Sequence, residues 1–174
     1  MDAFAQGLAA AGLRVLRFEF DYMAARREGG KRRPPDRQDK LLAQWHRVIE
    51  AVGPDKPVIG GKSLGGRMAS LIADEVGARA LLCLGYPFHP PGKPERLRTA
   101  HLETLTTPTL IVQGTRDPFG NRDEVGDYAL SAAIGFHWAE DGNHDLAPRK
   151  SSGRTTDQNW SSAIDAIVSF LNTV

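Results

Sequence analysis

Three residues whose types fit nucleophilic catalysis are spread along this sequence: Ser63, Asp117 and His144. A serine hydroxyl is a poor nucleophile at neutral pH, so it needs a base within hydrogen-bond reach. That base needs an acid that fixes its tautomer and stabilises its charged form. If the fold brings the three residues together, we expect Ser63 to attack, His144 to move the proton and Asp117 to orient the imidazole.

Ser63 lies in the segment Gly61-Lys62-Ser63-Leu64-Gly65, after the apolar run Pro57-Val58-Ile59 and before a helical pattern. A nucleophile at a sharp strand-to-helix turn has a sparsely populated backbone conformation, and flanking glycines allow the close backbone approach that this turn requires. Such a pentapeptide also occurs by chance in ordinary tight turns. The strand before it, the helix after it and the downstream acid and histidine favour the nucleophile.

Asp117 and His144 each follow a predicted strand. Asp117 comes after the apolar run Leu110-Ile111-Val112, in a turn where an aspartate could equally be a cap or turn former. His144 lies in the turn Asp141-Gly142-Asn143-His144-Asp145, where a packing role is less expected. Asp123 and Glu124 stand at the predicted start of a helix, where acids stabilise the helix dipole, so they are poorer candidates for the acid.

The other four histidines are weaker candidates for the base. His137 alternates with Phe136 and Trp138 in a predicted strand, which indicates a structural role. His46 and His101 lie in helical or loop surroundings without a matching partner. His89 is an alternative near the expected active face, although it lies in a proline-rich loop.

The elements that must position these residues alternate between helices and strands. Helical periodicity predicts the helices, and apolar runs bounded by glycine or proline predict the strands. The predicted helices cover residues 3–11, 36–52, 66–76, 122–131 and 159–171, and the predicted strands cover residues 13–20, 57–60, 80–85, 109–113 and 135–139. Residues 24–37 and 86–99 are expected to be surface loops.

This alternation predicts a single α/β domain over residues 1–174, with a doubly wound, mostly parallel sheet of about five strands and helices on both faces. Ligands of such sheets bind beyond the carboxyl ends of the strands. Ser63, Asp117 and His144 all come just after a predicted strand end. The predicted topology therefore places them at one edge of the sheet.

The composition is that of a globular domain, with 41% hydrophobic and 25% charged residues and a formal net charge of +1. No nucleic-acid or membrane partner is expected, because the charge is near neutral and no apolar stretch reaches the ~20 residues of a membrane span. The single Cys83 excludes an internal disulfide and is expected to be a buried thiol. Without a secretory signal at the start, a cytoplasmic location is expected. The oligomeric state is left open.

Three motifs carry a resemblance to a known family: Gly60-Gly61-Lys62-Ser63-Leu64-Gly65-Gly66-Arg67, Gln113-Gly114-Thr115-Arg116-Asp117-Pro118 and Gly142-Asn143-His144. With them the chain resembles the α/β-hydrolase superfamily over nearly its whole length. The stretch from Phe18 to Arg27 and a short connection in place of a large lid make it similar to small dienelactone-hydrolase-like bacterial proteins, which share a domain type with testis-expressed and NSL-complex hydrolase-like proteins. The resemblance implies Ser63 as nucleophile, Asp117 as acid, His144 as base and the Leu64 amide as one oxyanion donor.

The sequence departs from that superfamily at its start. An α/β-hydrolase normally has a strand and a glycine-rich loop before its first large helix, and the loop supplies the second oxyanion amide. Here the pattern begins inside the helix, and the missing strand belongs between residues 13–20 and 57–60. A vacancy would leave backbone groups unpaired at roughly 1–3 kcal/mol each. We expect that the natural protein starts upstream of Met1; the less favoured alternative is that the flanking strands close up or recruit a neighbouring chain.

Charged residues near the site have two interpretations each. Lys62 and Arg67 flank Ser63, and either could bind a substrate carboxylate, while Lys62 could equally pair with a nearby acid. A basic stretch invites a phosphate or nucleic-acid interpretation, but without interleaved aromatic residues it is better explained as a solvated loop. Its members are Arg26, Arg27, Lys31, Arg32, Arg33 and Arg37.

The function predicted from the sequence is hydrolysis of an ester, thioester or related acyl bond through a Ser-His-Asp triad and an acyl-enzyme, without a cofactor. The partner would be a small-molecule acyl substrate whose acyl and alcohol parts the sequence does not define. The alternative is a catalytically weak or inactive scaffold of the same fold, since losing one oxyanion donor typically costs about 10²- to 10³-fold in turnover.

Overall fold

Four parallel strands form the centre of the structure, a computed structural model that describes residues 1–174 except residues 28, 30–33 and 54. The strands lie in the order β1 (Val58–Lys62), β2 (Ala80–Leu84), β3 (Thr109–Gly114) and β4 (Ile134–Ala139), and each pairs in parallel with its neighbour. The predicted α/β fold with a parallel sheet is confirmed. Since the strands are parallel, their carboxyl ends all point to the same edge of the sheet.

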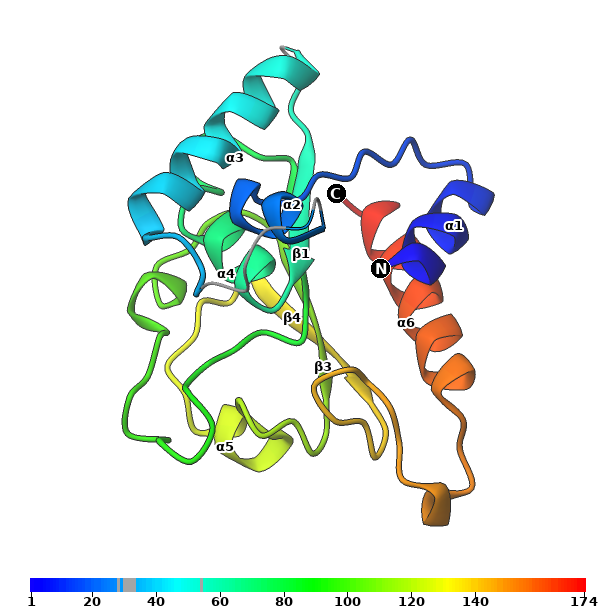
Figure 1. Ribbon diagram of the computed structural model, residues 1–174. Coiled ribbons are helices and arrows are strands. Elements are labelled where there is room, and N and C mark those ends of the chain that lie inside the picture. Colours follow the sequence, from blue (N-terminus) through cyan, green and yellow to red (C-terminus); the bar gives the residue numbers. More distant parts are fainter. Residues whose placement is uncertain (28, 30–33, 54) are drawn as a thin grey trace.

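Helices cover both faces of this sheet (Figure 1). On one side lie α3 (Gln38–Val52) and α4 (Leu64–Ser70), and on the other α1 (Asp2–Ala10) packs beside α6 (Thr156–Leu171). The shorter helical segments are α2 (Asp21–Arg27), η1 (Ala100–Leu102), α5 (Arg122–Gly126) and η2 (Lys150–Ser152). None of the helices in the described part of the chain combines the length and apolar character that crossing a membrane requires.

The strand side chains alternate between two apolar clusters, one on each face of the sheet. Leu81, Cys83 and Ile111 belong to the cluster that contains α3 and α4, whereas Ala80 and Leu84 belong to the cluster that contains α1 and α6. Cys83 has no solvent exposure, which confirms the expected buried thiol, and burial raises the pKa of that thiol. The sheet is therefore a rigid base for the loops at its carboxyl edge.

The predicted strand over residues 13–20 is wrong, because β1 is hydrogen-bonded to β2 alone and the segment belongs to no strand. A strand needs a ladder partner, and no described strand pairs with these residues. Contacts with α3 hold the segment instead. The rings of Phe18 and Trp45 meet edge to face at 4.7 Å. Gln44 accepts a hydrogen bond from the Asp21 amide at 2.9 Å and donates one to the Glu19 carbonyl at 2.8 Å, so its side chain replaces part of a ladder.

The segment and β1 remain apart and leave a cleft between them. Its volume is about 1280 Å³, and residues of the 14–24 segment, of α3 and of the stretch 57–65 line it. The less favoured expectation that the flanking strands close up is therefore wrong for this chain. The expectation of a start upstream of Met1 stays a prediction. The cleft reaches the end of β1, where Ser63 and Leu64 form part of its wall.

Several further predictions, on helix ends and loops, need correction. α4 ends at Ser70 and α5 at Gly126, earlier than the predicted ends at residues 76 and 131. The loop 86–99 is a surface segment only in its later part, since Tyr86, Phe88 and His89 are at most 2% exposed. The reason is aromatic packing: the Phe88 ring lies 4.8 Å from the Tyr86 ring and 5.5 Å from the Tyr128 ring. In the other loop, residues 24–27 belong to α2, and Lys31, Arg32 and Arg33 lie outside the described residues.

The packing of α4 against β1 gives a testable prediction about its two adjacent glycines. A Cβ on Gly66 would lie 2.6 Å from the Gly61 carbonyl oxygen, whereas a Cβ on Gly65 would meet no atom within 4 Å. We expect Gly66→Ala to lower the free energy of unfolding by about 1–3 kcal/mol, the usual cost of overpacking. Gly65→Ala should leave it unchanged or raise it by up to about 1 kcal/mol. Urea denaturation measures both, and equal effects of the two variants would contradict the packing argument.

Candidate active site

Ser63 occupies a strained turn between β1 and α4. Its backbone has φ 50° and ψ −115°, a conformation that non-glycine residues rarely adopt. The Ser63 amide donates to the Leu84 carbonyl at 2.9 Å, which extends the pairing of β1 with β2 up to this residue. The chain then turns directly into α4, whose first residue is Leu64. An amide in the first turn of a helix has no acceptor within the helix, so the Leu64 amide makes no hydrogen bond within α4.

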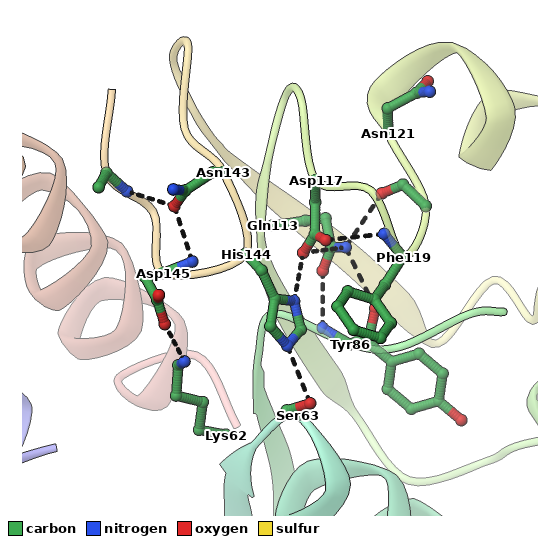
Figure 2. Close-up of polar contacts among 12 residues, drawn as sticks. Lys62, Ser63, Tyr86, Gln113, Asp117, Phe119, Asn121, Asn143, His144 and Asp145 are labelled. Atoms are coloured by element: carbon green, nitrogen blue, oxygen red, sulfur yellow. Dashed lines mark hydrogen bonds and ion pairs between the residues drawn. The ribbon is translucent and has the colours of Figure 1, made fainter. Parts of the chain in front are cut away.

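The three widely separated residues singled out from the sequence lie next to one another (Figure 2). His144 Nε2 is 2.9 Å from Ser63 Oγ, and His144 Nδ1 is 2.8 Å from Asp117 Oδ2. An ionised carboxylate only accepts, so Nδ1 carries the hydrogen and Nε2 accepts from the Ser63 hydroxyl. This arrangement can take the hydroxyl proton onto the imidazole while the carboxylate stabilises the resulting charge.

Asp117 is completely buried and fully hydrogen-bonded. Besides His144, its Oδ2 accepts from Gln113 Nε2 at 3.0 Å, and its Oδ1 accepts from the Phe119 amide at 2.9 Å. A buried carboxylate is costly unless such donors surround it. Asp123 and Glu124, the poorer candidates, belong instead to the first turn of α5, where Glu124 and Asn121 form a capping box.

Gln113 is a site residue whose role the sequence analysis missed. It has no solvent exposure, and its Oε1 accepts from the Tyr86 amide at 2.7 Å. Its Nε2 lies 3.1 Å from the Tyr86 carbonyl and 3.0 Å from the Gly120 carbonyl, in addition to its bond with Asp117. The signal in the sequence was a polar residue at the end of an apolar strand. Gln113 thus ties the segment after β2 to the carboxylate after β3.

The loop that carries His144 is held from several sides. A Cβ on Gly85, whose φ is 64°, would lie 2.9 Å from the His144 carbonyl oxygen, so the loop packs directly on the end of β2. The Phe119 and His144 rings lie 4.3 Å apart. Within the loop, Asn143 Oδ1 accepts from the Asp145 and Ala147 amides at 2.8 and 3.1 Å. These contacts fix the imidazole without tying up its Nε2.

Asp141 anchors the start of this loop. It has φ 52°, and its carboxylate pairs with Arg149 and lies 2.9 Å from Arg116 Nε. It also accepts from the Arg149 amide at 2.7 Å. These hydrogen bonds and charges, first among them the hydrogen bond from the Arg149 side chain, lower the pKa of Asp141 to about 2. The ion pairs connect the His144 loop to both the turn after β3 and the segment before η2.

The two basic residues that flank Ser63 in the sequence have different surroundings. Lys62 pairs with Asp145, so of its two interpretations the pairing with a nearby acid is the one observed; the pair and Asn143 appear in Figure 2. Arg67 forms no ion pair with any described residue. In the basic stretch, Arg27 pairs with Glu19 at 3.3 Å, and Arg37 lies 3.5 Å from Asp39.

The remaining histidines have other partners. His89 Nδ1 lies 2.9 Å from the Pro90 carbonyl, and its Nε2 lies 3.5 Å from Glu124 Oε2. His137 Nε2 is 3.3 Å from Ser162 Oγ, and His46 is 3.7 Å from Glu75. His101 Nε2 is 2.8 Å from Ser70 Oγ. Among the described residues, His144 alone is hydrogen-bonded to the Ser63 hydroxyl.

Comparison with known protein families agrees with this architecture. The family model described as alpha/beta hydrolase domain matches residues 1–172, which is nearly the whole chain.

Several solved structures share the fold. An alpha-beta serine hydrolase homologue from Coxiella burnetii is 18% identical, with 96% of this chain and 73% of that chain covered and a TM-score of 0.70. The esterase domain of a Rhodothermus marinus protein is 15% identical, with 97% of this chain and 78% of that chain covered and a TM-score of 0.66. A putative hydrolase of the alpha/beta superfamily from Xanthomonas campestris is 21% identical, with 97% of this chain and 88% of that chain covered and a TM-score of 0.64. At these identities the matches establish the fold.

The lowered pKa of Asp141 predicts how stability changes with pH. Because the folded state holds this pKa at about 2 instead of 3.8, the ion pairs stabilise the fold above about pH 4, and this contribution is lost as the pH falls toward 2. We expect Asp141→Asn, which tolerates the same backbone conformation, to unfold at a lower temperature than the wild type at pH 6. That difference should shrink between pH 4 and pH 2.

Thermal unfolding followed by circular dichroism measures this difference. Asp165→Asn is the matched control, because Asp165 is exposed on α6. A gap between wild type and Asp141→Asn that stays constant from pH 6 to pH 2 would show that these ion pairs do not stabilise the fold.

Proposed function

The chain belongs to the alpha/beta hydrolase domain family, and from this we propose that it is a serine hydrolase acting on an ester, thioester or related acyl bond. The observation that carries the proposal is the hydrogen-bond chain from Ser63 Oγ through His144 to Asp117, with distances of 2.9 and 2.8 Å. The same residues at greater separation would be ordinary turn formers. The esterase domain among the structures of this fold adds support for an ester.

In the proposed reaction the Ser63 hydroxyl attacks the acyl carbon while His144 Nε2 takes its proton. The negative charge that develops on the carbonyl oxygen is stabilised by the Leu64 amide at the start of α4. His144 then returns the proton to the leaving group, an acyl-enzyme forms on Ser63, and water releases the acid by the reverse steps. Asp117 holds the imidazole in the required tautomer throughout. These steps use only protein groups and water.

The cleft beside β1 supports a substrate with an apolar part. Ser63 and Leu64 lie at its end, and its wall carries aromatic and aliphatic side chains, among them Phe18, Tyr22, Trp45 and Ile49. Such walls bind apolar groups through the hydrophobic effect, while a few polar groups orient the reacting bond. The dienelactone-hydrolase-like resemblance of the sequence remains a prediction about substrate, as does a cytoplasmic location.

Labelling with a fluorophosphonate probe tests Ser63 as the nucleophile. These probes react with serines that a neighbouring base activates, so we expect one label per chain, on Ser63, found by mass spectrometry of the digested protein. Ser63→Ala should abolish labelling, while Ser162→Ala, which removes a serine hydroxyl on α6, should not. Labelling of Ser63→Ala at the wild-type rate would remove Ser63 from the mechanism.

Turnover of short activated esters tests the base. We expect His144→Ala to lower kcat/KM by about 10²- to 10⁴-fold, the usual contribution of a general base. His46→Ala is the control, since His46 lies on α3 beside Glu75. If the wild type hydrolyses none of a panel of activated esters and thioesters, the inactive scaffold becomes the better explanation. Equal activity of the wild type and His144→Ala would exclude the proposed proton transfer.

A further inference from the structure

One hydrogen-bond network links three basic residues: Arg67, Arg98 and His101, hereafter the basic cluster. Arg67 lies on α4, one turn after Ser63. Arg98 lies in the connection from β2 to η1, and His101 is part of η1. Burial and the nearby charge of Arg67 both lower the pKa of Arg98 and the pKa of His101, so Arg67 is within electrostatic reach of each of the other two groups.

A hydrogen-bond network fixes the backbone of both arginines. The Ser70 hydroxyl donates to the Arg67 carbonyl at 2.7 Å, and the Tyr86 hydroxyl donates to the Arg98 carbonyl at 3.2 Å. His101 Nε2 lies between these hydroxyls, 2.8 Å from Ser70 Oγ and 3.4 Å from the Tyr86 oxygen. Because the single proton of Ser70 is already donated, His101 Nε2 carries the hydrogen between them. Ser70 and Tyr86 are at most 2% exposed, so the network is a rigid frame.

The charges in this frame are uncompensated. In the described part of the chain, neither guanidinium forms a hydrogen bond or an ion pair, and Arg67 Nε is buried without an acceptor. Elsewhere, partly buried cations have partners: Lys62 pairs with Asp145, and Arg116 pairs with Asp141. Two like charges held near each other and partly removed from water destabilise a fold unless a counter-charge joins them.

We propose that Arg67 and Arg98, held in place by the network around His101, bind an anion, a carboxylate or a phosphate group. The planar guanidinium fork matches the two oxygens of either group, and a buried N–H without an acceptor gains most from one. The site is distinct from the Ser63–His144 pair but connected to it. The Tyr86 hydroxyl contacts the basic cluster, while the Tyr86 backbone is held by Gln113, which also holds Asp117.

Binding of inorganic phosphate and of succinate to the full-length chain tests the proposal. Isothermal titration calorimetry and thermal unfolding are run at constant ionic strength, with chloride as the reference anion. We expect saturable binding of one or both probes and a rise in the unfolding temperature. Arg67→Gln and Arg98→Gln should each weaken binding by about tenfold or more, which is the effect of losing a hydrogen bond between charged groups. Arg47→Gln, which removes an exposed arginine on α3, should bind as the wild type does.

Three further variants keep the test decisive. If a glutamine variant fails to fold by circular dichroism, Arg67→Lys and Arg98→Lys retain the charge but lose the fork, and weaker binding is again expected. Ser63→Ala should bind the probes unchanged, which separates this site from the proposed hydrolysis. Absence of saturable binding in the wild type, or equal binding by all the arginine variants, would overturn the proposal.

Ester substrates separate the two sources of the anion. If the anionic group belongs to the substrate, Arg67→Gln should raise KM for a succinate monoester several-fold and leave KM for the matching acetate ester unchanged. If it is a free anion, phosphate should bind while both esters respond equally to the substitution. Both results support an anion site, and the direct binding measurement remains decisive even if the chain hydrolyses neither ester.

Discussion

The carboxylate of Asp117 imposes the strictest constraint in this structure, because it is fully buried and must find donors for both oxygens. It obtains them from three places: the His144 ring, the Gln113 side chain and the Phe119 amide. Each donor comes from a different part of the carboxyl edge of the sheet. Meeting the needs of one buried charge therefore sets the positions of the turn after β3, the loop after β4 and, through Gln113, the segment after β2.

The sequence allowed the parallel fold and the location of the candidate site to be predicted, because both depend on local signals. Ser63, Asp117 and His144 each follow an apolar run that indicates a strand, and parallel strands bring their carboxyl ends to one edge. The catalytic roles of these residues stay a prediction. The structural role of Gln113 was not predicted, because its partners Tyr86 and Gly120 are brought to it by tertiary packing. The predicted strand at residues 13–20 failed for a related reason: β-propensity describes a residue's preference, whereas a strand exists only beside a partner.

The open side of β1 shows how a fold accommodates a missing ladder. Residues 13–20 do not join the sheet and are held against α3 instead, since Phe18 packs on Trp45 and the Gln44 amide bonds the backbone on both sides of Phe20. The cleft that results lies directly beside Ser63. In the proposed reaction the Leu64 amide at the start of α4 is one oxyanion donor, so the efficiency of that reaction would depend on which other donors reach this cleft.

Tyr86 connects two hydrogen-bond networks that contain charged groups. Protein groups compensate the charge in one network and not in the other. Its backbone bonds to Gln113 in the network where the negative charge of Asp117 is fully compensated. Its hydroxyl lies in the network around Arg67 and Arg98, where positive charge is concentrated without a counter-charge from the described residues. Protein interiors compensate the charges that they bury, and the first network obeys this rule with protein groups alone. The anion proposed above would compensate the second network, and Tyr86 would connect that anion to the network around Asp117.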